Sequence, residues 1–164
     1  MQVDVYSAQS VHGVNVIKGG KYMKYDWNIH AVLQNEEATL KFPYLVDYHT
    51  HGLEKHGLKN LCMFFDYGDN GLTNAELINT IAELMIHGEK FNLDRCHAID
   101  GGIGTPILFK FYLEKKIWHG EEMLQIVVLD ENGGIPELGD DELVNRYRYQ
   151  LLNTSTLRYI FGDK

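Results

Sequence analysis

WNIHAVLQNEEATLKFPYLVDYHTH, residues 27–51, is the stretch that decides the fold. Its two ends are rich in β-branched and aromatic residues, and the polar segment Asn-Glu-Glu at 35–37 stands between them. Two such runs around a polar turn are typical of a hairpin. The sequence therefore predicts one strand over Trp27–Leu33, a second over about Thr39–Tyr48, and a reversal of the chain between them.

Further strands are predicted outward from this hairpin. Short or weakly alternating apolar runs occupy residues 2–7, 14–18, 61–65, 107–112 and 124–129. Runs of four to eight such residues bounded by polar or glycine-rich segments indicate strands that are half or fully buried.

One helix is predicted over Thr73–His87, where apolar residues recur at helical spacing. Thr73 and Glu76 form a capping box at its start, and Gly88 stands where a helix end favours glycine. Most of this helix should be buried. A shorter C-terminal helix is expected from the acidic residues at 140–142 through about residue 152, because acids favour the first turn.

These elements predict an α+β fold in a single domain, residues 1–164. We expect a mainly antiparallel, twisted sheet of about five or six strands, with one long buried helix (73–87) and a shorter C-terminal helix. A doubly wound sheet would need regular alternation of strands and helices, which the sequence lacks.

Composition and charge restrict the kinds of partner that the protein is expected to bind. The chain has 164 residues, 45% of them hydrophobic, and a formal net charge of −8. This is a globular composition, and its acidity argues against nucleic acid as a partner. No apolar stretch is long enough for a membrane helix, and MQVDVYSAQS at the start does not resemble a secretory signal. We therefore expect a cytoplasmic protein. Cys62 and Cys96 form no C-x-x-C pair.

The segment Val-Asp-Tyr-His-Thr-His at 46–51 is a candidate metal motif. Side chains two apart on a strand point the same way, so His49 and His51 could reach one divalent ion. In a metal-dependent hydrolase, Asp47, Glu54 or His56 would assist.

Chain length and ligand spacing both speak against a metal-dependent barrel. Barrels that carry such a motif usually exceed about 200 residues, and their motif lies near the N-terminus. Later candidates, among them His97, Asp100, His119 and Asp130, have no recognisable ligand spacing.

Several segments of the chain follow one another in the order of a known family pattern. They are Asp26–Ile29, Tyr48–Leu53, Gly57–Leu61, Gly88–Phe91, Leu124–Val127 and Asp130–Pro136. Over about residues 26–138 the chain thus resembles the bacterial domain of unknown function 4262. The family has no established activity, so the resemblance implies a fold and leaves the function open.

This sequence departs from the family pattern at the candidate metal motif. His49 and His51 replace a tyrosine and a β-branched residue, while Thr50, Gly52 and Leu53 match. Lys59-Asn60 replaces a Pro-Glu pair, and Glu137 replaces a tryptophan. On this resemblance the two histidines are not a shared ligand pair.

Three functions follow as hypotheses. The first is a non-catalytic binding or interaction protein, comparable to immunity proteins that cover basic nuclease sites. An acidic face including Asp140, Asp141 and Glu142 would bind another protein. Nothing in the sequence speaks against a homo-oligomer.

The second hypothesis is a small-ligand site at the end of the Tyr48–Leu53 segment. Trp27, Tyr48 and Thr50 would contact the ligand, and Gly52 would allow its close approach. The third hypothesis is the metal-dependent hydrolase with His49 and His51 as ligands. No catalytic residue is assigned, and no cofactor is expected except a divalent metal in this third case.

Overall fold

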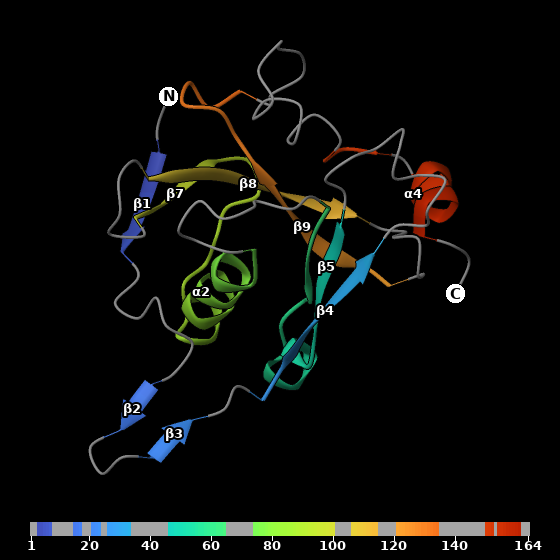
Figure 1. The fold of residues 1–164 in the computed structure, drawn as a ribbon. Coiled ribbons are helices and arrows are strands. Elements are labelled where there is room, and N and C mark those ends of the chain that lie inside the picture. Colours follow the sequence, from blue (N-terminus) through green and yellow to red (C-terminus); the bar gives the residue numbers. More distant parts are fainter. Residues whose placement is uncertain are drawn as a thin grey trace.

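The computed structural model describes residues 3–7, 15–17, 21–23, 26–33, 46–64, 74–100, 106–114, 121–134, 150–152 and 154–161 of the chain. A mixed sheet of seven strands forms its centre (Figure 1). The strands are β1 (Val3–Ser7), β4 (Asn28–Leu33), β5 (Val46–His51), β6 (Leu61–Met63), β7 (Cys96–Asp100), β8 (Ile107–Glu114) and β9 (Met123–Val128).

The strand order in this sheet is β1-β7-β8-β9-β6-β5-β4. Four neighbouring pairs are antiparallel, namely β7–β8, β8–β9, β5–β6 and β4–β5, whereas β1–β7 and β6–β9 are parallel. The strand β4 is therefore an edge strand paired with β5. Two further strands, β2 (Asn15–Ile17) and β3 (Lys21–Met23), pair antiparallel with each other.

The helix α2 (Asn74–Ile86) packs against one face of the sheet. Leu77 and Ile81 of the helix are fully buried together with Leu61, Met63 and Ile126 of the sheet. Each such side chain contributes about 1.5–3 kcal/mol when it leaves water. The apolar spacing that predicts the helix is thus the spacing that buries it.

The C-terminal end of α2 is closed by Gly88, which has φ 98°. The N–H of Glu89 donates to the carbonyl of Leu84 at 3.0 Å, the long bond of a Schellman ending. The predicted helix end is confirmed. The predicted capping residue Thr73 lies outside the described residues.

The helix α4 (Thr154–Phe161) covers part of the opposite face. Its residues Leu157, Ile160 and Phe161 pack with Cys62 and Phe64. Cys62 lies between Leu61 and Met63, and alternate residues of a strand face opposite sides. The helices α2 and α4 therefore contact opposite faces of the sheet.

Side-chain amides fasten the segment before α4 to the sheet, and Gln125 of β9 donates to the carbonyl of Gln150. Gln150 accepts from the N–H of Val128 at 2.7 Å and donates to its carbonyl at 2.9 Å. The Gln150 amide therefore makes the two hydrogen bonds to the main chain of Val128 that a neighbouring strand would otherwise make.

The α+β class and the mainly antiparallel pairing are confirmed. The described residues form seven strands in the main sheet, one more than the upper number predicted. The strands β3 and β7 were not predicted from the sequence. The C-terminal helix also differs: Gln150 and Leu151 lie in a turn, and the observed helix begins at Thr154. Residues 140–149, where the predicted helix would begin, lie outside the described residues.

Candidate metal centre

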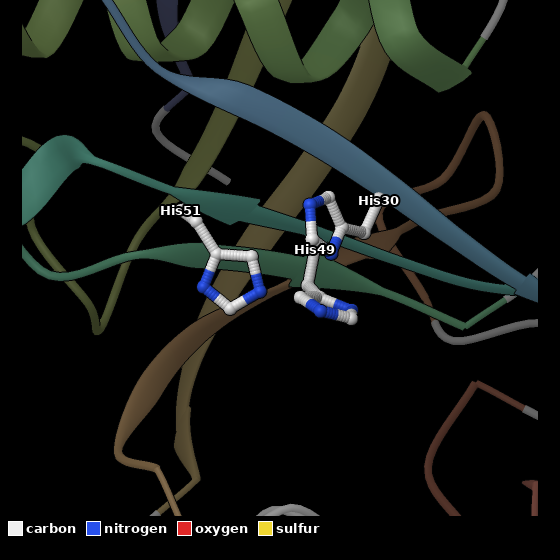
Figure 2. Close-up of side chains that lie close together, drawn as sticks. All are labelled: His30, His49 and His51. Atoms are coloured by element: carbon white, nitrogen blue, oxygen red, sulfur yellow. The ribbon is translucent and has the colours of Figure 1, made fainter.

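Three histidines from two strands meet on one side of the sheet. The register of β4 and β5 places His30 opposite His49 and Asn28 opposite His51. Since His49 and His51 are two residues apart, all three imidazoles leave the same face. Figure 2 shows the rings of His30, His49 and His51 together on the side of these strands that faces away from α2.

The three rings are close enough to share one ion. Their centroids lie 5.5 Å apart for His30 and His49, 4.5 Å for His30 and His51, and 4.8 Å for His49 and His51. One nitrogen from each ring lies within 4.8 Å of the other two. His49 is buried, His51 is half-buried and His30 is exposed, so the cluster opens to solvent at the edge strand.

A buried carboxylate orients the innermost ring. Asp47 is fully buried, and its Oδ1 lies 3.1 Å from Nδ1 of His49. A carboxylate oxygen accepts hydrogen bonds, so this contact favours a proton on Nδ1 of His49 and leaves Nε2 as the atom that would bind a metal. This is the carboxylate–histidine arrangement that supports metal-ligating imidazoles.

The surroundings of His51 favour its uncharged form. Burial lowers the pKa of His51, the charges of His49 and His30 lower it further, and Glu121 and Glu54 act in the opposite direction. Because a metal ligand must be the neutral imidazole, the lowered pKa keeps His51 ready to bind at a lower pH than an ordinary histidine.

The geometry fits zinc after a small inward turn of the rings. Zn–N bonds of about 2.0–2.1 Å in a tetrahedron place ligand nitrogens about 3.4 Å apart. The observed upper separation of 4.8 Å exceeds this by about 1.4 Å. His49 is held by Asp47, so the movement would fall to His30 and His51, whose rings are more exposed.

A second group of polar residues lies at the end of β5, beside His51. The amide of Asn60, which is buried, donates through Nδ2 to Glu54 and to Glu121, each at 2.9 Å. Its Oδ1 accepts from the hydroxyl of Thr50 at 3.1 Å and from the N–H of Leu53 at 3.2 Å. All four hydrogen-bonding sites of the amide are used, and these partners allow only one orientation of it.

The residues predicted to contact a small ligand are built into the fold. Trp27 is buried and its Nε1 donates to Asn79 of α2 at 2.9 Å. Tyr48 packs against the core under α2, and Thr50 is fully buried. Gly52 has φ 114°, and an added Cβ would meet the carbonyl oxygen of Asp26 and Cα of Trp27 at 3.0 Å. The close approach that Gly52 permits is to the chain itself.

Two of the predicted assisting residues take other partners. His56 lies in the short helix η1 (Leu53–His56), and its Nε2 is 2.9 Å from both carboxylate oxygens of Asp26. Glu54 accepts from the N–H of Gly52 at 2.9 Å as well as from Asn60. Asp47 is the predicted assisting residue that contacts a histidine of the cluster, through its hydrogen bond with His49.

Sequence reasoning missed His30. Its signal was available in part, because Asn28, His30 and Val32 alternate with Ile29 and Ala31 along the predicted strand. The alternation shows which side chains of this strand share a face, but it does not show which residue of the neighbouring strand lies opposite His30. The observed pairing of His30 with His49 places the third imidazole beside the other two.

None of the helices in the described part of the chain has the length and apolar character of a membrane span. The acidic segment 140–142, proposed as a partner surface, lies outside the described residues. Comparison of the chain with models of protein families, with curated proteins and with solved structures finds no match. The resemblance to the domain of unknown function 4262 stays a prediction.

Proposed function

We propose that this protein binds one divalent transition-metal ion through His30, His49 and His51, and that the centre serves metal-assisted hydrolysis. The observation that carries the proposal is the convergence of three imidazole nitrogens within 4.8 Å, with the innermost ring held by a buried carboxylate at 3.1 Å.

Three histidines are a ligand set of catalytic zinc sites. Structural zinc sites usually have four protein ligands, whereas catalytic sites keep three and leave the fourth position to water or substrate. Bound zinc lowers the pKa of its water to about 7 and polarises a carbonyl or phosphoryl group. Because His30 is exposed on the edge strand, water or substrate would reach a bound ion from that side.

The ligand type also narrows the metal. Imidazole suits zinc, copper, iron and nickel, whereas magnesium and calcium prefer oxygen ligands. We therefore expect selective binding of Zn²⁺ and of its spectroscopic substitute Co²⁺ over Mg²⁺ and Ca²⁺.

The test is metal titration of tag-free protein that has been stripped with a chelator. Calorimetry with Zn²⁺ should give one ion per chain, and Co²⁺ should give the visible absorption of a four-coordinate ion. His30→Ala and His51→Ala should weaken binding more than about 100-fold, since even loss of a supporting partner costs about 10- to 100-fold. Asp47→Asn removes such a supporting partner and should weaken zinc binding by about 10- to 100-fold.

His56→Ala is the matched control, because His56 is exposed, pairs with Asp26 and does not belong to the three-histidine group. It should bind zinc like the unaltered protein. Binding should also weaken as pH falls, since protons compete for the imidazoles. Substoichiometric binding, or equal affinity after loss of His49 and His51, would remove the proposal.

The other two functions stay predictions. The segment proposed to meet a protein partner lies outside the described residues, and the residues proposed for a small ligand have intramolecular contacts. Metal binding that serves hydrolysis is the function that the geometry of the described residues supports best.

A further inference from the structure

Two carboxylates are held together beside the histidine cluster. Glu54 Oε2 and Glu121 Oε1 each lie 2.9 Å from the same nitrogen, Nδ2 of Asn60. The two oxygens are therefore at most 5.8 Å apart, which is twice 2.9 Å. Their bridge, Asn60, is buried and has no other orientation that satisfies its partners.

The pair lies on the His51 side of the cluster. Glu54 Oε2 also accepts from the N–H of Gly52, the residue that follows His51. Glu54 is therefore fixed next to the residue that follows His51, and Asn60 holds Glu121 beside Glu54.

The surroundings keep Glu54 ionised. Hydrogen bonds lower the pKa of Glu54, first from its own backbone N–H, then from Asn60 and from the N–H of Gly52. Two close negative charges repel each other, and the chain already has a net charge of −8. A divalent cation at the neighbouring imidazoles would offset that repulsion.

From this arrangement, and on the basis of the proposed metal site, we infer that Glu54 and Glu121 select what occupies the metal's fourth position. They form an anionic wall that strengthens cation binding and disfavours anions at the ion. The substrate class is then a neutral or cationic molecule, such as an amide or an ester without a nearby acidic group, and not a phosphate or a carboxylate.

The physical reason is that a carboxylate charge acts in opposite directions on a cation and on an anion. A carboxylate several ångströms away attracts a divalent cation and repels an anion bound to it. Both effects are weakened by salt. A change that only damaged the fold would instead lower both affinities.

The experiment uses the full chain loaded with Co²⁺ and the anion azide as a probe, followed by visible absorption at low ionic strength. Variants are Glu54→Gln, Glu121→Gln and the double change, which preserve size, remove the negative charge and keep one acceptor oxygen. Glu122→Gln is the matched control, because Glu122 is an exposed neighbour of Glu121 that pairs with Lys59.

The double variant should bind azide about three- to tenfold more tightly and Co²⁺ about tenfold more weakly than the unaltered protein. Each single variant should show part of both changes, and Glu122→Gln less than about twofold in either. Unchanged azide affinity in the double variant, or a fall in both affinities, overturns the inference while the metal site stands. Failure of the unaltered chain to bind Co²⁺, or equal binding after His51→Ala, overturns the metal site and the inference together.

Discussion

The hydroxyl of Thr50 should be worth more to stability than its methyl group. Thr50 lies between His49 and His51 and is fully buried. Its Oγ1 accepts from the N–H of Leu61 at 2.8 Å and donates to Oδ1 of Asn60 at 3.1 Å. The β5–β6 pairing runs through Tyr48–Met63 and His49–Cys62, so the hydroxyl takes over where main-chain pairing stops.

Thr50→Val preserves shape and removes both hydrogen bonds. Leaving the buried N–H of Leu61 without this acceptor costs about 1–3 kcal/mol, and the second bond contributes about 1 kcal/mol. The added methyl group returns about 0.8 kcal/mol. The expected net loss is about 2 kcal/mol in the free energy of unfolding.

The assay is urea unfolding followed by tryptophan fluorescence and circular dichroism. With a slope near 2 kcal/mol per molar urea, Thr50→Val should shift the midpoint down by about 1 M. Thr50→Ser is the control, since it keeps the hydroxyl and loses only a methyl group, at about 1 kcal/mol. The urea midpoint should be highest for the unaltered protein, lower for Thr50→Ser and lowest for Thr50→Val. If Val is as stable as the unaltered protein and Ser is weaker, packing and not hydrogen bonding holds this position.

Two further predictions concern the chain around the site. Gly52→Ala should lower the free energy of unfolding by about 2–4 kcal/mol, because φ 114° strains any other residue by about 1–2 kcal/mol and the new Cβ meets backbone atoms at 3.0 Å. The control Gly57→Ala, at φ 70° with open space around it, should cost only about 1 kcal/mol. Equal midpoints of the two variants in chemical denaturation would refute the close approach at Gly52. The hydrogen bond with His56 lowers the pKa of Asp26, so its stabilising contribution is present above the unfolded-state pKa and is lost as pH falls through the folded-state value. The difference in urea midpoint between the unaltered protein and Asp26→Asn should therefore shrink between about pH 5 and pH 2.5, and a constant difference across that range would contradict the pairing.

Much of the fold could be predicted because its signals are local. Period-2 and continuous apolar runs predict β6, β8 and β9 within a few residues of their observed ends. The capping glycine and helical spacing predict α2. The strand β7 was missed because Cys-His-Ala-Ile-Asp is too short and mixed to show a clear pattern, and it is defined by its neighbours β1 and β8.

The helix α4 was missed for a different reason. Its first residues, Thr154-Ser155-Thr156, are of the kind that favours helix starts, but the acidic residues at 140–142 offered a competing start. The helix is held by burying Leu157, Ile160 and Phe161 on the sheet. That gain depends on a surface which no local pattern specifies.

What the sequence by itself determined is the pair His49 and His51 on one face of a strand, because side chains alternate with a period of two. What only the tertiary structure decided is the approach of a third imidazole, His30, and the pairing of the Glu54 and Glu121 carboxylates through Asn60. A hairpin turning at 35–37 would place His30 opposite about residue 42, whereas residues 34–45 separate the two strands and the observed partner is His49. Register is set by burying the correct face and by long-range pairing, and a slip of one residue would turn the histidines to the other side.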